Sequence, residues 1–141
     1  MYHARRAPRL ERFCLACSPD GKWLAFFINM RNDGALMIIP SAGGEPRELY
    51  RCEPKKEQFT TLRWTPDGKY ILFVIREIEQ KKLNLWRIPV EGGQPQKIDL
   101  GINVTDLSVH PDGQHIALGT RENQPSEVWV VENFLPQDVG K

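Results

Sequence analysis

SPDGKWLAF begins at Ser18, TPDGKYILF at Thr65 and HPDGQHIAL at His110. The three stretches are copies of one element, a Pro-Asp-Gly turn followed by an apolar run. Their prolines stand at positions 19, 66 and 111, so the chain repeats about every 46 residues. A period of this length predicts one small sheet of about four strands in each repeat.

A second motif repeats in phase with the first, because IPSAGGEPREL from Ile39 and IPVEGGQPQKI from Ile88 share their Gly-Gly pair and prolines. Each motif has a mechanical reason. Proline sets φ for the first central position of a tight turn, aspartate accepts hydrogen bonds from nearby backbone N–H groups, and glycine takes the positive φ that closes the turn. The predicted hairpin tips are formed by Pro19, Asp20, Gly21, Pro66, Asp67, Gly68, Pro111, Asp112 and Gly113.

The strands between these turns define three blades in one domain that spans residues 1–141. We place blade 1 at about 13–50, blade 2 at about 59–100 and blade 3 at about 104–134. The second strand of each blade is continuously apolar, as in WLAFFI and YILFVI. Such strands are typical of sheets covered on both faces. We therefore expect an all-β fold of antiparallel blades stacked around an axis, which is a β-propeller.

The ends of the chain are out of phase with its blades. Residues 7–12 stand where an outer strand precedes the next blade, although the blade to which this spare strand would belong is missing. Blade 3, in contrast, has no convincing outer strand of its own. We expect its last position to be filled by an N-terminal strand from a neighbouring copy or from a longer chain.

The Pro-Asp-Gly-Lys turn, the apolar run and the Gly-Gly-x-Pro turn together resemble the TolB-like, PD40 (WD40-like) repeat of bacterial β-propellers. The stretch EVWVVENF from Glu127 looks like the last blade of such propellers. The resemblance covers nearly the whole chain and implies a ring of about six blades, of which this chain supplies three. Either the chain is part of a longer propeller, or two copies close a six-bladed ring as a head-to-tail homodimer.

Composition narrows the range of partners. The formal net charge is +1, with 19 Lys and Arg against 18 Asp and Glu, which predicts no attraction to nucleic acid. No stretch is long and apolar enough to insert into a membrane. We expect a cytoplasmic protein, or a periplasmic one if the chain belongs to an exported protein, because TolB itself is periplasmic.

No catalytic motif is present, so we expect no enzyme activity, no cofactor and no metal. Cys14 and Cys17 lack the second ligand pair of a zinc site. His110 and His115 have no ligand spacing with each other and are interpreted as variants of the repeat. The three turn aspartates are interpreted as turn formers, and Trp23, Trp64, Trp86 and Trp129 as core residues.

Loops at the ends of rigid strands are where propellers meet partners, so the loops on one rim are the best candidates for function. The connections at 29–34, 77–82, 121–126 and 51–58 are expected to share that rim. We predict that it binds a protein or peptide. The alternative function is a sensory or substrate-gating part of a larger regulator, kinase or peptidase. The candidate binding residues are Arg31, Asp33, Glu77, Glu79, Lys81, Lys82, Arg121 and Glu122.

Overall fold

A computed structural model describes residues 14–30, 33–120 and 127–136. Within these ranges the chain forms β-strands and no α-helix, so no described helix is available to cross a membrane. The strands are β1 (Leu15–Cys17), β2 (Trp23–Met30), β3 (Asp33–Pro40), β4 (Arg47–Arg51), β5 (Glu57–Trp64), β6 (Tyr70–Glu77), β7 (Lys82–Pro89), β8 (Gln96–Ile98), β9 (Val104–Val109), β10 (His115–Thr120) and β11 (Glu127–Glu132).

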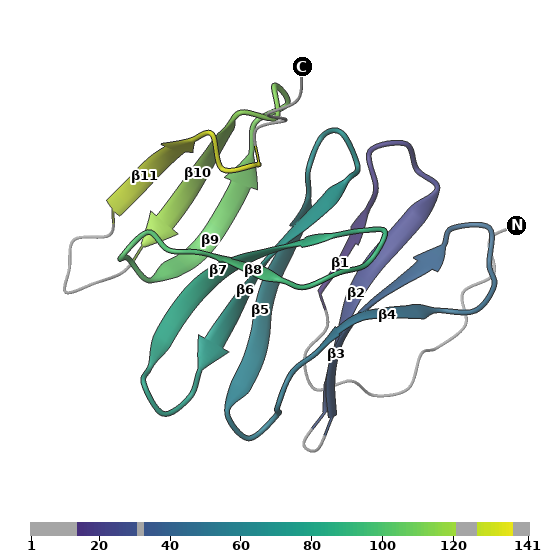
Figure 1. The fold of residues 1–141 in the computed structure, drawn as a ribbon, viewed down its shortest axis with the longest axis horizontal. Coiled ribbons are helices and arrows are strands. Elements are labelled where there is room, and N and C mark those ends of the chain that lie inside the picture. The colour runs from purple at the N-terminus through teal and green to yellow at the C-terminus, as the bar shows by residue number, and fades with distance from the viewer. Residues whose placement is uncertain (1–13, 31–32, 121–126, 137–141) are drawn as a thin grey trace, which may run out of the picture.

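Each repeat folds into its own antiparallel sheet, and Figure 1 shows the three sheets side by side in chain order. The first two sheets are four-stranded, in the orders β1-β2-β3-β4 and β5-β6-β7-β8. The third contains β9, β10 and β11, and no described strand pairs with the outer edge of β11. The predicted all-β propeller arrangement is confirmed. The predicted outer strand of residues 7–12 lies outside the described residues.

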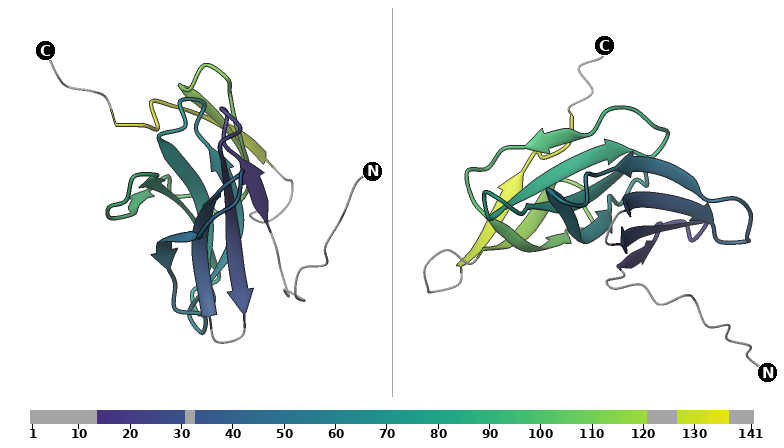
Figure 2. Two further views of the ribbon diagram at one scale, coloured as in Figure 1. Left: turned by 90° about the vertical axis from the view of Figure 1, so that its right-hand side faces the viewer. Right: turned by 90° about the horizontal axis from the view of Figure 1, so that it is seen from below.

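Two apolar cores fill the spaces between neighbouring sheets. β6 contributes to both, because Ile71, Phe73 and Ile75 belong to the core shared with the first sheet, whereas Leu72 and Val74 belong to the core shared with the third. All five side chains are at most 1% exposed. Burial on both faces therefore explains the continuous apolar pattern of this strand. Figure 2 shows the same three sheets in two further views.

Three hydrogen bonds from side chains to backbone oxygens link the first two sheets. The Trp64 indole Nε1 donates to the carbonyl oxygen of Ala16 at 2.9 Å, and the Asn29 side-chain amide donates to the carbonyl oxygen of Phe59 at 3.0 Å. The Arg47 guanidinium donates to the carbonyl oxygen of Val90 at 2.6 Å. These bonds satisfy backbone oxygens of the facing sheet and so fix the angle at which the sheets meet.

The third sheet ends in an uncovered apolar face. Val128 occupies the register position of Leu36 and Leu85, which are buried against the next sheet in the first and second blades. Val128 is instead 78% exposed and Val130, on the same face, is 65% exposed. The open face of the third sheet is thus the surface on which a following blade would stack.

The prediction that all four tryptophans pack in the core is wrong for Trp129. Trp64 is 8% exposed and Trp23 and Trp86 pack against the first core, but Trp129 is 46% exposed. Trp86 is flanked on its outer side by Lys97 of β8. Trp129 holds the corresponding position on β11, where no described outer strand shields it.

Candidate functional site

The antiparallel order of the strands sorts the connections onto two opposite rims. The Pro-Asp-Gly turns and the Gly-Gly turns lie together at one end of the sheets, and we call this end the turn rim. The β2–β3 and β6–β7 connections and residues 52–56 lie at the other end, which we call the loop rim. The loop rim is the one for which a binding role was predicted.

The β6–β7 hairpin is the centre of the loop rim. Glu77 and Lys82 pair across the two strands, and Lys81 closes the turn with a φ of 53°. Glu79, Lys81 and Lys82 are exposed, and Ile78 is 39% exposed among these charges. The Ile78 backbone N–H donates to the carbonyl oxygen of Lys56 at 2.8 Å. This bond joins the hairpin to the 52–56 connection, so the two loops form one surface.

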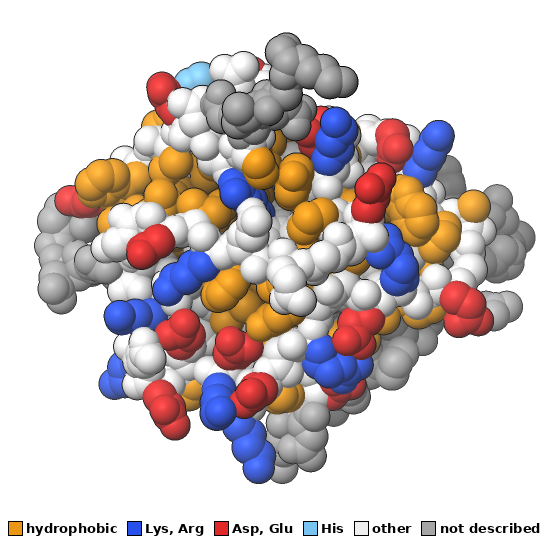
Figure 3. Space-filling model, viewed as in Figure 1, with side chains coloured by type: hydrophobic (Ala, Val, Ile, Leu, Met, Phe, Trp, Pro, Cys, Tyr) orange, Lys and Arg blue, Asp and Glu red, His pale blue; other side chains and the backbone are white. Residues whose placement is uncertain are grey.

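A second charged group continues the loop rim onto the first sheet. Arg51 forms ion pairs with Asp33 and Glu48. The hydrogen bond to Glu48, together with the charges of Asp33 and Glu48, raises the pKa of Arg51 above its ordinary value. Lys56 forms an ion pair with Glu53 at 2.9 Å. Positive and negative side chains alternate along this end of the molecule, as Figure 3 shows at its lower edge.

The loop assignments need one correction. Asp33, Glu77 and Lys82 were predicted in loops but are the terminal residues of β3, β6 and β7. The hairpins are tighter than the sequence indicates, because the strands continue to their ends in register, with Met30 opposite Asp33 and Glu77 opposite Lys82. Of the other predicted residues, Arg31, Arg121 and Glu122 lie outside the described residues.

On the turn rim, the turn-forming role of the three aspartates is confirmed. In the first turn, Asp20 Oδ1 accepts from the Ser18 hydroxyl at 2.6 Å and from the Lys22 backbone N–H at 2.9 Å. The bond from Ser18 is the main cause of a lowered Asp20 pKa. Asp67 makes the same two bonds with Thr65 and Lys69. The glycines that follow have φ values of 73°, 71° and 71° for Gly21, Gly68 and Gly113.

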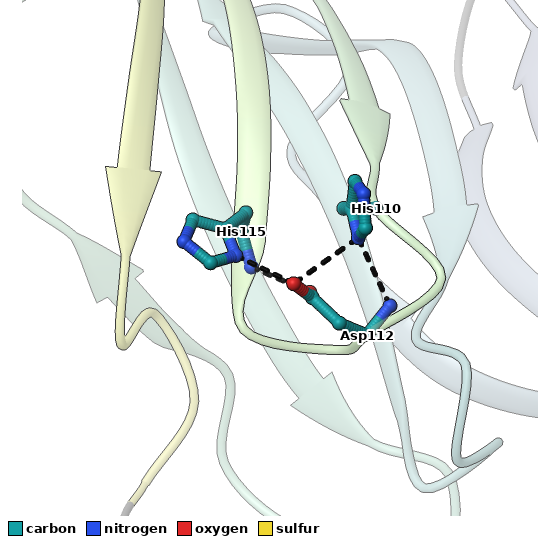
Figure 4. A group of neighbouring side chains, drawn as sticks. All are labelled: His110, Asp112 and His115. Carbon is teal, nitrogen blue, oxygen red and sulfur yellow. Dashed lines mark hydrogen bonds and ion pairs between the residues drawn. The ribbon is translucent and has the colours of Figure 1, made fainter.

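The third turn keeps this backbone but surrounds its aspartate with two histidines (Figure 4). Asp112 Oδ2 lies 3.1 Å from His110 Nδ1 and 2.7 Å from His115 Nδ1. Asp112 Oδ1 accepts from the backbone N–H of Gln114 at 2.8 Å. The bond from Gln114, helped by His115, lowers the pKa of Asp112 to about 2, and the bond to Asp112 raises the pKa of His115.

The sequence interpretation that these histidines have no common ligand spacing is therefore wrong. Their ring nitrogens and the Asp112 carboxylate all lie within 4.8 Å of one another. The missed signal was the repeat itself. Positions 18 and 23 flank the aspartate in the first turn, where the Trp23 backbone N–H donates to the Ser18 hydroxyl at 3.0 Å, so the corresponding positions in the third turn must also converge.

The three cysteines are free and show no common site. Cys17 is exposed, Cys14 is half-buried and packs against the first core, and Cys52 is 5% exposed. Burial raises the pKa of the Cys52 thiol to about 11, and the charge of Glu57 adds to this effect. The side chains of Cys14 and Cys17 thus have different surroundings.

No protein-family model and no curated protein sequence matches the chain. Several solved structures are similar to it. TolB from Acinetobacter baumannii matches 84% of this chain with a TM-score of 0.65 and 19% identity, over 29% of its own length. The β-propeller domain of the Trilobed protease from Pyrococcus furiosus, which has an open velcro topology, matches 85% with a TM-score of 0.61 and 16% identity, over 39% of its length.

The acylaminoacyl peptidase from Pyrococcus horikoshii matches 79% of this chain with a TM-score of 0.62 and 14% identity. The chain spans only 22% of that protein, and less than half of each of the other two. These likenesses show the fold, which is that of β-propeller blades.

Proposed function

We propose that this chain is a non-catalytic propeller scaffold that binds a protein or peptide through the loop rim. The observation that carries the proposal is the β6–β7 hairpin, whose exposed charges flank the half-exposed side chain of Ile78. An apolar contact surrounded by charges of both signs is the usual composition of a protein-binding surface, with its apolar centre and polar rim. A partner with a complementary charge pattern would be selected and oriented by these side chains.

The rigid support of the hairpin favours the same role. Its strands lie in the most buried sheet of the molecule, and the Asn84 side-chain amide donates to the Glu77 carboxylate at 2.9 Å just below the turn. The neighbouring 52–56 connection is held by the Ile78–Lys56 bond. A binding surface that is already ordered loses little conformational entropy when the partner docks.

The test is charge reversal on the hairpin. The variant Glu79→Lys, Lys81→Glu, Lys82→Glu is compared with a control variant of equal charge change on the turn rim, Glu91→Lys, Lys22→Glu, Lys69→Glu. A partner captured by chemical cross-linking is identified and purified, and its affinity for each chain is measured by calorimetry. We expect the affinity for the partner to fall by at least ~10-fold in the hairpin variant and to change little in the control. Equal affinity of both variants would refute the loop rim as the binding surface.

A second candidate function is a substrate-gating or sensory part of a larger protein. It is favoured by the likeness to the propeller domain of a protease and to an acylaminoacyl peptidase, of which this chain would correspond to a fraction. Sequencing the DNA on both sides of the stretch that encodes this chain distinguishes the two functions. A neighbouring hydrolase domain in the same frame would support gating.

We further propose that a second copy of the chain covers the open face of the third sheet. The first sheet presents a surface of the complementary kind, because Leu15 is 50% exposed and Leu24 and Ile28 are half-buried on the side away from the second sheet. Within the chain, the corresponding faces of neighbouring sheets already pack against each other in the two apolar cores. Two copies arranged head to tail would repeat this contact and close a ring of six blades.

A further inference from the structure

We propose that His110, Asp112 and His115 form a binding site for a divalent transition-metal ion of the zinc class on the turn rim. The site lies at the opposite end of the sheets from the loop rim, so it is independent of the proposed function. Two imidazole nitrogens and one carboxylate oxygen are a ligand set that Zn²⁺ accepts, whereas Ca²⁺ and Mg²⁺ prefer oxygen ligands alone.

The donor atoms converge in a way that an ion can use. His110 Nδ1 and His115 Nδ1 approach the same carboxylate oxygen, Asp112 Oδ2, at 3.1 and 2.7 Å. Donor atoms around a tetrahedral zinc ion are separated by roughly 3.3 Å when each lies about 2.0–2.1 Å from the metal. The side chains of His110, Asp112 and His115 are 61%, 36% and 38% exposed, so small side-chain rotations suffice to reach that spacing.

Surrounding groups orient the ligands. Metal-bound histidines usually donate their second ring N–H to a carboxylate, and ligating carboxylates are themselves hydrogen-bonded. His115 meets the first condition, since its Nε2 lies 3.2 Å from Glu132 Oε1 on the neighbouring strand β11. Asp112 meets the second, since its Oδ1 accepts from the backbone N–H of Gln114 and leaves Oδ2 for the ion.

His110 Nδ1 lies 3.1 Å from the Asp112 backbone nitrogen and 3.1 Å from Asp112 Oδ2. In the neutral tautomer with the proton on Nε2, Nδ1 has a lone pair that accepts from this backbone N–H. A bound ion would take over that lone pair from the N–H group. Three protein ligands leave a fourth position for water or for a side chain of another molecule.

The first two turns show that these residues are not required by the turn itself. The same backbone is built with Ser18 and Trp23 in the first blade and with Thr65 and Tyr70 in the second. Replacing both flanking positions by histidine changes the chemistry of the tip without changing its fold. These natural alternatives also supply variants that keep the turn intact.

The experiment is a calorimetric titration of the full, untagged, metal-free chain with Zn²⁺. It uses a Cys14→Ser, Cys17→Ser, His3→Gln background, which removes the accessible thiols and the remaining histidine. We expect one ion per chain and no competition from excess Ca²⁺ or Mg²⁺. His110→Ser and His115→Tyr, which install residues of the first and second blades, should each weaken binding by at least ~10-fold, and Glu132→Gln by roughly 10-fold.

A second readout identifies the binding atoms. The ring ¹⁵N shifts of both histidines, measured by nuclear magnetic resonance, should report metal bound to Nδ1 and a proton on Nε2 of each ring. The matched control is Ser18→Ala in the first turn, which should leave zinc affinity unchanged. Zinc binding that survives the double variant His110→Ser, His115→Tyr, or ring shifts that do not respond to zinc, would overturn the proposal.

Discussion

At the scale of single residues, Gly34 and Cys52 depend on each other. A Cβ atom added at Gly34 would overlap the Cys52 sulfur, and the Cys52 backbone N–H donates to the Gly34 carbonyl oxygen at 2.9 Å. We expect Gly34→Ala to lower the free energy of unfolding by about 1–3 kcal/mol, because the buried sulfur has little room to move. Denaturant unfolding measures this loss.

The partner substitution provides the control for that prediction. Cys52→Ala removes the sulfur, so Gly34→Ala should cost much less in this background than in the wild type. The difference between the two costs is the coupling energy of the pair. Equal costs in both backgrounds would contradict the steric explanation.

The Cys52 thiol also predicts how stability depends on pH. Its pKa is raised to about 11 in the folded protein from an ordinary value of 9.0. The folded state therefore prefers the neutral thiol, whose stabilising effect is complete below the pKa of the unfolded chain and is lost as the pH rises through the folded value. We expect the free energy of unfolding to fall between about pH 9 and about pH 11, and to fall less in Cys52→Ala. An unchanged pH profile in that variant would assign the loss to Tyr50, whose pKa burial raises to about 12.

At the scale of elements, one of the hydrogen bonds between the first and second sheets is donated by the indole N–H of Trp64. Trp64→Phe keeps an aromatic ring in the core but leaves the Ala16 carbonyl oxygen without the indole N–H that bonds it at 2.9 Å. We expect a loss of about 1 kcal/mol in the free energy of unfolding. Trp129→Phe is the matched control, because Trp129 is largely exposed, and its effect on unfolding should be close to zero. Similar losses for both variants would argue against a role for the inter-sheet bond.

The elements themselves were predicted well because each is bounded by a turn with a strong local cause. Gly21, Gly68 and Gly113 adopt the positive φ that the Pro-Asp-Gly motif requires, so the start of each second strand was correctly placed. The β2–β3 and β6–β7 hairpins carry no such signal. Their strand ends were misplaced because cross-strand pairing, and not local residue preference, extends them to Asp33 and Lys82.

The candidate sites were less predictable, since they depend on proximity in space. Trp129 was expected in the core by analogy with Trp86, but burial at that position needs an outer strand, and the third repeat has no convincing one of its own. The histidine cluster was missed because residues separated by two and five positions meet only when a tight turn folds one strand end back on the other. Hydrophobic periodicity does not register such a contact.

At the scale of the whole molecule, the open face of the third sheet predicts self-association. We expect light scattering coupled to size exclusion to give twice the 16.2 kDa of one chain. Val128→Glu combined with Val130→Lys places charges on the open face and should convert this dimer into a monomer, because removing charged groups from water into an apolar contact costs free energy even when the charges are paired. Both side chains are mostly exposed in the isolated chain, so the variant should keep its fold.

The control for self-association is a charge pair placed away from the open face of the third sheet and from the outer face of the first, such as Lys22→Glu with Glu91→Lys on the turn rim. This variant should remain a dimer. A monomeric wild-type chain would contradict closure by a second copy, and large aggregates would indicate that the contact propagates without closing.

The uncovered face of the third sheet has a consequence for how such molecules can grow. An arc of stacked blades has two ends whatever its length, so each added repeat contributes one more internal contact while the amount of adhesive surface stays constant. Lengthening the arc therefore makes it more stable but no less prone to stick to other molecules. Only the step that joins the last blade to the first removes both ends at once. Selection for solubility would then act on closure as a whole, and not on the gain or loss of single blades.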